Sequence, residues 1–368
     1  MRYDKVLKFL LFAFVVGSVL GLVGGLTLGG SRTHASPSTK TAAGKADTTT
    51  STAADEETAE PMTAEKARAI GANEMGMIPV LEYHKITKPE DQTAPEPDYC
   101  RSALHFKQDI ELLMSEGYYP ITVKDLATGT IDIPAGKSPV VLTFDDSSPG
   151  QYRVLDDGTI DPESAVGILQ AASRDGRWPL KACFYVLLDV NPPDNILFGQ
   201  PDLQQEKMRN LVKWGCEVGS HTYTHLNFQK STEEVIRKEL ALSKQKIESL
   251  VGDDYEVYTI CVPFGEYPDD ISILQSGEYD GVSYTYGAAL EVTGGPSPSP
   301  FSSKFNPMRI PRIEVQHDAL KQAIDNLKKN PDLRYISDGD PAVISVPATL
   351  SEKLGTLKEK LGRPVITY

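Results

Sequence analysis

The chain has 368 residues, 40% of them hydrophobic, and a formal net charge of −14 at pH 7. This length and apolar content are sufficient for one large folded domain with a further segment attached. The acidic excess argues against nucleic acid and anionic lipid as binding partners, and it leaves neutral and cationic ligands open.

The N-terminus has the pattern of a membrane anchor. Basic residues precede an uncharged apolar stretch at 9–28, which at about 1.5 Å per residue can cross a bilayer core of about 30 Å. We expect residues 1–30 to form a retained single-pass helix that places the rest of the chain at the extracytoplasmic face of the cell membrane. Because Thr33-His-Ala35 resembles a signal-peptidase site, secretion after cleavage near Ala35 is the alternative.

Residues 31–76 are rich in Ser, Thr and Ala and hold few large apolar side chains, so a flexible tether is predicted there. The folded domain is predicted over residues 77–368. Its cysteines are expected to be free thiols, since most of them fall in or beside apolar strands.

Strand-like apolar runs alternate with amphipathic helical patterns through this domain. Strands are predicted near 78–81, 119–123, 140–144, 182–188, 258–262, 308–313 and 342–346, and helices near 102–116, 163–176, 203–214, 231–252 and 318–329. Residues 286–306 are expected to be irregular. The alternation predicts an α/β fold with parallel strands and outer helices, and it leaves both an open sheet and a closed barrel as solutions.

Two stretches carry residues suited to metal chemistry. Asp145 and Asp146 end an apolar strand, and successive side chains on extended backbone point to opposite faces, so the two carboxylates can take different roles. His221 and His225 lie four residues apart and can face one way from a helical turn, offering two nitrogens to one divalent ion. One carboxylate and two imidazoles leave room for a water molecule, as a catalytic metal requires.

These residues resemble a known family. Thr143-Phe-Asp-Asp146, His221-Thr-Tyr-Thr-His225 and the later Cys261-Val-Pro-Phe-Gly-Glu266 are similar to motifs of the polysaccharide deacetylases, the NodB homology domains of carbohydrate esterase family 4. The resemblance covers residues 77–350. It implies an irregular, incomplete (β/α)₇ barrel with its reactive groups at the carboxyl ends of the strands.

The resemblance also implies roles for the motif residues. Asp146, His221 and His225 would bind a divalent metal ion, zinc first, with cobalt or nickel as alternatives. Asp145 would be the general base. The backbone N–H of Phe264 would stabilise the oxyanion.

His84 is the expected catalytic acid. Tyr83-His84 is similar to a pair that supplies this acid in the subgroup related to the poly-N-acetylglucosamine deacetylases, and the chain lacks a convincing Leu-x-His motif on a late strand. The last histidine, His317, precedes a predicted helix and is expected to be exposed.

One position departs from the family pattern. Many members carry an arginine that orients the base two residues before the third-motif proline, and here that position is Cys261. Arg309 or Arg312 could reach the base instead, or either could be structural. Tyr223, Pro263 and Arg312 are the remaining candidates for lining the substrate, and Tyr223 could equally pack under the metal-binding turn.

The expected function is metal-dependent removal of N-acetyl groups from a cell-envelope or exopolysaccharide glycan of the N-acetylglucosamine type. An acetylated polysaccharide would then be the substrate partner. An O-acetyl esterase acting on an acetylated polysaccharide and a non-catalytic surface glycan-binding module are the alternatives.

Overall fold

The computed structural model describes residues 60–88, 98–190, 197–252 and 254–368. The predicted membrane helix and the predicted tether up to residue 59 lie outside these ranges. In the described part of the chain, no helix combines the length and apolar character needed to span a bilayer. The described residues belong to one unit, Ala59–Tyr368.

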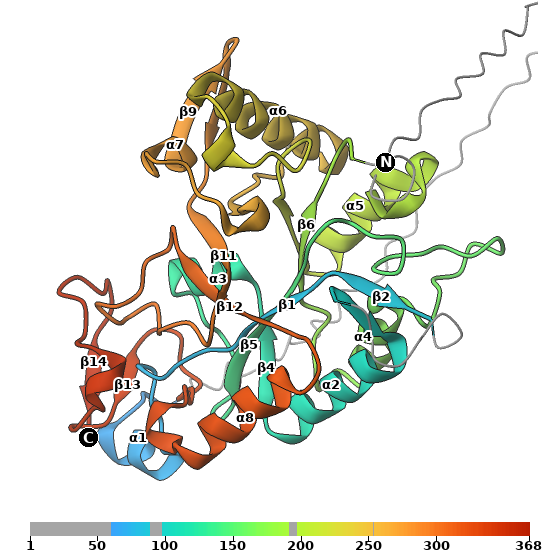
Figure 1. Cartoon of the computed structure of the whole chain (residues 1–368). Helices are drawn as coiled ribbons and strands as arrows, with labels where there is room; N and C mark the ends of the chain where they lie inside the picture. The colour runs from blue at the N-terminus through green and yellow to red at the C-terminus, as the bar shows by residue number, and fades with distance from the viewer. Residues whose placement is uncertain (1–59, 89–97, 191–196, 253) are drawn as a thin grey trace, which may run out of the picture. The chain divides into compact units, whose positions relative to one another are not determined.

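Seven parallel strands form a closed ring in the order β1, β12, β11, β8, β7, β6, β5 and back to β1. In Figure 1, β1 lies beside β5 and β12. Their bounds are β1 Val80–Tyr83, β5 Ser138–Phe144, β6 Cys183–Val186, β7 Glu217–Ser220, β8 Thr259–Cys261, β11 Ala288–Gly294 and β12 Ile310–Glu314. An eighth strand, β4 (Tyr118–Ile121), pairs with the first half of β5, while β1 pairs with the second half. The α/β barrel implied by the resemblance is therefore present, and its ring closes.

The ring is uneven. β7 and β8 share a single register pair, Ser220 with Ile260, and the register of β11 against β12 shifts between Leu290 and Gly294. Three short pairs lie outside the ring: β2 (Lys85–Thr87) with β3 (Cys100–Ser102), β9 (Ser276–Tyr279) with β10 (Val282–Thr285), and β13 (Ile344–Val346) with β14 (Val365–Thr367).

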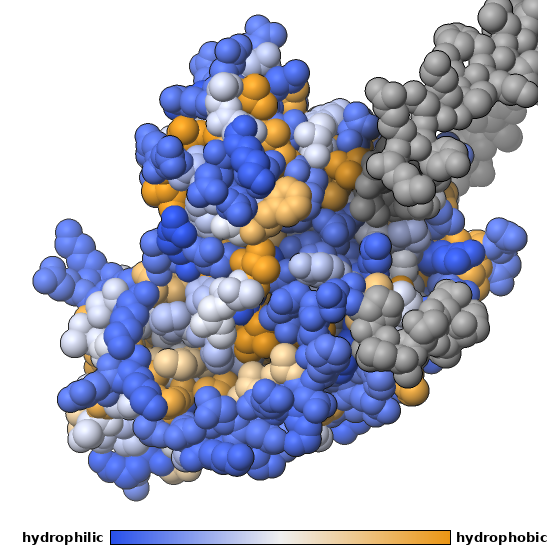
Figure 2. Space-filling view, in the orientation of Figure 1, coloured by the Kyte–Doolittle hydropathy of each residue, from blue (hydrophilic) through white to orange (hydrophobic). Residues whose placement is uncertain are grey.

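Helices pack against the strands and against one another. Their bounds are α1 Ala64–Ile70, α2 Ala103–Ser115, α3 Val123–Thr128, α4 Ala165–Ser173, α5 Gln204–Lys213, α6 Glu233–Val251, α7 Ser272–Gln275 and α8 Ala319–Lys329. α6 begins where the Thr232 hydroxyl accepts the N–H of Val235, close to the predicted start of this helix near residue 231. α8 buries Leu320, Ile324 and Leu327, and the surface over α2 and α8 is mostly hydrophilic (Figure 2).

Alternation along the strands sorts buried side chains into two clusters. On β5, Leu142 and Phe144 belong to the cluster shared with the outer helices, whereas Val141 belongs to the other. The second cluster receives one or more side chains from nearly every ring strand, including Val80, Cys183, Leu290 and Ile310, and it therefore fills the inside of the ring. By the same parity Glu82, Asp145 and Arg312 point inward near the carboxyl ends of their strands.

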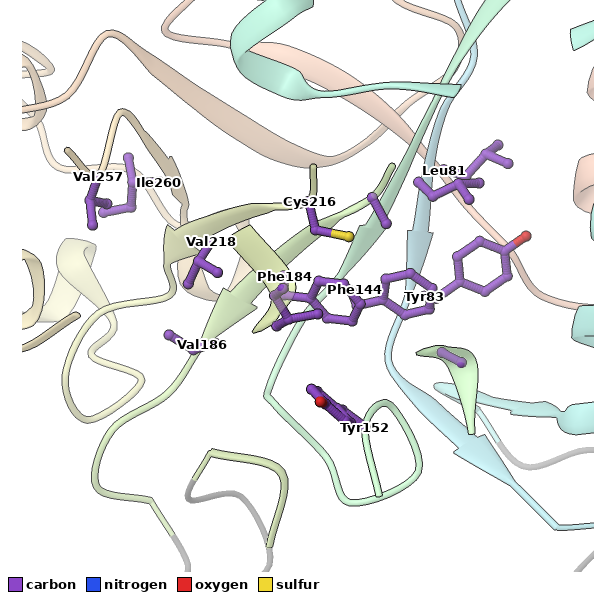
Figure 3. Packing of buried hydrophobic residues seen from close by; sticks show 14 of the residues in the cluster. Leu81, Tyr83, Phe144, Tyr152, Phe184, Val186, Cys216, Val218, Val257 and Ile260 are labelled. Atoms are coloured by element: carbon purple, nitrogen blue, oxygen red, sulfur yellow. The ribbon is translucent and has the colours of Figure 1, made fainter. Parts of the chain in front are cut away.

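Three aromatic rings join neighbouring strands at these ends. The rings of Tyr83 and Phe144 stack with centroids 5.4 Å apart, and those of Phe144 and Phe184 with centroids 5.0 Å apart (Figure 3). Each such pair contributes about 0.5–1.5 kcal/mol beyond the area it buries. Because His84 and Asp145 directly follow two of these rings, the row fixes where both residues leave the core.

Two sequence-based boundaries are wrong. Residues 286–306, expected to be irregular, contain β11, because pairing with β8 and β12 outweighs the weak strand preference of Ala288 and Ala289. The folded unit also begins before residue 77. Ala67 and Met75 are fully buried, and the backbone of Asn73 is bonded to that of Ile336 in the C-terminal part of the chain.

Candidate active site

The carboxyl ends of the ring strands surround a cavity of about 310 Å³. Acidic groups, histidines and apolar side chains all contribute to its wall. The lining residues are Glu82, His84, Tyr99, Asp145, Asp146, His221, His225, Val262, Phe264 and Val292. The predicted base, acid and metal ligands thus share one cavity.

The loop after β5 is bonded to the end of β1. The Gln151 side-chain amide donates to the backbone oxygens of both Asp145 and His84, and the Ser148 hydroxyl also donates to that of His84. Gly150 allows this close approach, since a Cβ there would lie 1.8 Å from the backbone oxygen of Ile86. These contacts hold the predicted acid beside the two aspartates.

The two motif histidines lie on an irregular turn after β7, and the predicted helical turn is wrong. Thr222 and His225 have φ of 67° and 58°, outside the helical region. The side chain of Glu239 on α6 accepts the N–H groups of Tyr223 and Thr224, each at 2.8 Å, and the Thr224 hydroxyl at 2.9 Å. A buried glutamate therefore stabilises a turn that local sequence preference does not predict.

Asp146, His221 and His225 are brought together with the spacing of metal ligands. Asp146 Oδ1 lies 3.5 Å from His221 Nε2 and 3.7 Å from His225 Nε2, and one ligand atom from each residue lies within 4.8 Å of the others. Two atoms bound to one tetrahedral zinc at about 2.1 Å lie about 3.4 Å apart. The donors and their spacing therefore fit a divalent ion.

The orientation of His221 also suits metal binding. Its Nδ1–H donates to the backbone oxygen of Cys261 at 2.9 Å, which leaves the lone pair of Nε2 directed at Asp146 and His225. An outer hydrogen bond of this kind fixes the tautomer of a ligating histidine.

Asp145 is held by Arg312. Nη1 donates to Oδ1 at 3.0 Å and Nη2 to Oδ2 at 2.8 Å, while Nε donates to the backbone of Glu291. Burial alone would raise the pKa of Asp145, but the charge of Arg312 and its hydrogen bonds outweigh it and hold that pKa well below its usual range. Asp145 is therefore an ionised, fixed carboxylate.

Cys261 occupies the position where many relatives carry the orienting arginine, and its thiol donates to Asp145 Oδ2 at 3.1 Å. Arg312 reaches the same carboxylate from β12, so this strand supplies the guanidinium that the third motif lacks. Arg309 lies apart, in an ion pair with Glu291.

Glu82 is a site residue that motif reasoning missed. Its carboxylate is almost fully buried, with Oε1 3.5 Å from His84 Nε2 and Oε2 3.2 Å from Arg312 Nη2. Oε2 has no hydrogen-bond partner in the described structure, and burial raises the pKa of Glu82 despite the charge of Arg312. The sequence could have identified Glu82 from the two-residue period of a strand, because Val80, Glu82 and His84 are spaced two apart and lie on one face of an inner strand.

His84 lines the same cavity as His221 and His225. Burial lowers its pKa, and the nearby charges of Asp145 and Asp146 offset this only in part. Its ring packs edge-on against that of Tyr99, with centroids 4.9 Å apart. The imidazole therefore has a protonatable carboxyl on one side and an aromatic ring on the other.

The remaining predicted residues divide into lining and buried groups. Phe264 lines the cavity, with its ring centroid 4.4 Å from that of His225, whereas Pro263, at the start of the same short helix Pro263–Gly265, is buried. Tyr223 packs against the outer hydrophobic cluster, and neither it nor Pro263 is among the lining residues. Arg312 has no exposed surface, so its substrate-lining role is wrong; it contacts the predicted base instead.

Comparisons with known proteins point to one family. Residues 132–282 match the family model described as polysaccharide deacetylase. The chain is 22% identical over 220 residues to YxkH of Bacillus subtilis (strain 168), a relative that carries the same family name, with 59% of this chain and 68% of that protein covered.

Solved structures resemble the fold. BA0330 of Bacillus anthracis matches with a TM-score of 0.51 at 22% identity, covering 68% of each chain. The deacetylase PplD of Streptococcus pyogenes, solved in complex with acetate, matches with a TM-score of 0.50 at 20% identity, covering 69% of this chain and 97% of that one.

Proposed function

The chain belongs to the polysaccharide deacetylase family of hydrolases, and from this premise we propose that it is a metal-dependent enzyme that removes N-acetyl groups from a glycan of the N-acetylglucosamine type. The glycan would be a cell-envelope polymer or an exopolysaccharide. One observation carries the proposal: three metal-type donors lie in one cavity beside an aspartate held in ionised form by Arg312.

The donor set suits zinc first, with cobalt or nickel as alternatives. Two imidazole nitrogens and one carboxylate oxygen match the ligand preference of these ions and leave a coordination position open. Bound there, the ion would act as a Lewis acid towards the acetyl carbonyl and lower the pKa of water.

The residues of the chain would then move the protons. Asp145 would accept a proton from the attacking water. Its two hydrogen bonds with Arg312 keep the carboxylate oxygens in a fixed orientation during this step. The same pairing lowers its basicity, so its contribution is a fixed orientation and an ionised carboxylate that is ready to accept this proton. The backbone N–H of Phe264 is the proposed donor to the developing oxyanion.

The pair formed by Glu82 and His84 supports an amide rather than an ester as the substrate. An amine is a poor leaving group unless its nitrogen is protonated, whereas an ester needs such help less. Glu82 binds a proton more tightly than an exposed carboxyl and lies 3.5 Å from His84. His84 would pass a proton to the departing nitrogen and recover it from Glu82.

The place of action is part of the proposal. The apolar stretch at residues 9–28 supports a domain held at the outer face of the cell membrane, where envelope and secreted glycans are found. Cleavage near Ala35 would release the same domain as a secreted enzyme.

Acetate release from a β-1,6-linked N-acetylglucosamine oligomer and from acetylxylan, each with zinc-loaded protein, tests the proposal. We expect release from the first substrate. We also expect loss of both activity and one bound metal ion per chain in Asp146→Ala, whereas His317→Ala, which alters an exposed histidine, should retain both. Turnover of acetylxylan alone would instead make the protein an esterase. Glycan binding with no acetate release and no stoichiometric metal would make it a binding module.

A further inference from the structure

We propose that Tyr99 forms a sugar-stacking subsite at the rim of the cavity, on the His84 side, which holds the pyranose ring next to the unit being deacetylated. The inference rests on the proposed function, since it assumes a linear glycan as the ligand. It assigns this chain a contact with the polymer beyond the reacting acetyl group.

Exposure singles out this residue. Five large hydrophobic side chains are exposed among the described residues, and the two aromatic ones, Tyr99 at 53% and Phe264 at 58%, both line the cavity. The aliphatic three, Leu104, Val235 and Val365, do not line it. Exposed aromatic rings concentrated at one cavity indicate a ligand that covers them.

The backbone of Tyr99 is held in an unfavourable conformation. Its φ of 62° lies in the left-handed region, where a residue with a Cβ is disfavoured. The backbone oxygen of Tyr99 accepts the N–H of Lys85 at 3.0 Å, and the following residues pair with β2 as strand β3. Such strain at a cavity rim persists when a functional requirement selects the position of the side chain.

The two exposed rings occupy different walls. Tyr99 packs edge-on against His84, and Phe264 packs edge-on against the metal-ligand histidine His225. Edge-on contact with a histidine leaves a face of each ring available to a ligand. A glycan unit whose acetyl group reached Asp146 would therefore extend towards Tyr99 on the side of the proposed acid.

The chemistry of the rim suits a sugar. A pyranose ring has faces made of C–H groups and edges made of hydroxyls, so one face can pack on an aromatic ring while the edges stay hydrated. A flat, uncharged tyrosine ring provides that surface without a fixed hydrogen-bond pattern. The subsite should consequently recognise the presence of a neighbouring sugar more than its substituents.

Equilibrium binding of de-N-acetylated β-1,6-linked glucosamine oligomers of one to five units tests the subsite, because these products cannot be turned over. The zinc-loaded protein is compared with Tyr99→Ala and with Tyr99→Asn, which removes the ring but tolerates a left-handed backbone. Tyr99→Phe retains the ring, and Leu104→Ala removes an exposed apolar side chain away from the cavity.

We expect both ring deletions to raise Kd for oligomers of three or more units by about tenfold and to leave Kd for the monosaccharide unchanged. Tyr99→Phe and Leu104→Ala should match the wild type. If Tyr99→Asn binds the pentamer as tightly as the wild type, or if the wild type binds no oligomer of any length, the subsite is rejected. Ring-dependent binding without acetate release would reject the proposed activity alone, and acetate release with ring-independent binding would reject the subsite alone.

Discussion

Arg312 and Asp145 lie 167 positions apart in the chain, yet they meet in two parallel hydrogen bonds of 3.0 and 2.8 Å. Both side chains are buried, one from β12 and the other from the end of β5. A guanidinium opposite a carboxylate in this fork fixes the carboxylate in rotation as well as in charge. The orientation of the proposed base therefore depends on closure of the ring through β1 and β12.

Arg312→Lys should reduce activity strongly. Lysine retains the charge but cannot bond both carboxylate oxygens in the fixed fork, so Asp145 loses its orientation. We expect kcat/KM for deacetylation to fall by about 10²-fold, with bound metal unchanged. Arg309→Lys, which alters a partly exposed ion pair with Glu291, is the matched control and should stay within about twofold of wild type. Equal effects of the two substitutions would contradict a role for the fork.

Glu82→Gln should lower kcat while the metal site stays intact. The amide has the same shape as the carboxyl group but cannot supply a proton to His84, 3.5 Å away. We expect kcat on the amide substrate to fall by about 10²-fold, with a smaller loss on an acetate ester that has a better leaving group. Glu65→Gln, which changes an exposed glutamate of α1 away from the cavity, is the control. An equal loss on amide and ester would exclude proton supply as the role of Glu82.

Glu239→Ala should weaken metal binding from outside the ligand shell. This side chain accepts three hydrogen bonds from the turn that carries the two motif histidines. We expect the affinity for zinc, measured by competition with a chelator, to fall by about 10–100-fold. Glu239→Gln should retain most of the affinity, because its amide oxygen can accept the two N–H groups and its amide nitrogen can donate to the Thr224 hydroxyl. Wild-type affinity in Glu239→Ala would show that the turn is stable without this support.

Glu74 should make stability fall as pH rises. Burial, helped by the charge of Asp338, raises the pKa of Glu74 from 4.5 to about 8. In the folded state the proton is kept up to about pH 8, whereas the unfolded chain releases it near pH 4.5, so unfolding releases a proton between these values. The free energy of unfolding should therefore decrease with rising pH, by at most about 1.4 kcal/mol per pH unit from this group.

Urea unfolding at pH 5 to 8.5 measures this slope. Glu74→Gln should flatten it, since glutamine can accept the N–H of Ser345 and donate to the Tyr335 hydroxyl without a titrating proton. Glu65→Gln changes an exposed residue of α1 and should leave the slope as it is. A wild-type slope in Glu74→Gln would assign the pH dependence to another group.

The strand and helix pattern of this chain was largely predictable because it depends on local residue order. The run at residues 139–146 predicts an inner strand that ends in two carboxylates, and β5 and the inward position of Asp145 agree with this. The predicted opposite faces are wrong, because Asp146 leaves the strand with a φ of 72° and both carboxylates line the same cavity. Elements whose residues have only a weak local preference for the observed backbone conformation were not predicted. β11 begins with two alanines, and the left-handed residues of the histidine turn take that conformation only because Glu239 and the strands around them hold it.

What the sequence alone determined was the set of chemical groups: two adjacent aspartates, a histidine pair four residues apart and a histidine at the end of an early strand. Only the tertiary structure decided which groups share a cavity, because closure of the ring brings β1, β5 and β12 together across more than 200 residues of chain. Because the ring closes, Arg312 and not Arg309 contacts Asp145, and Glu82 lies beside His84. Side chains that meet through burial leave no local pattern, since their pairing depends on strand order and on the low dielectric between strands, which local spacing does not encode.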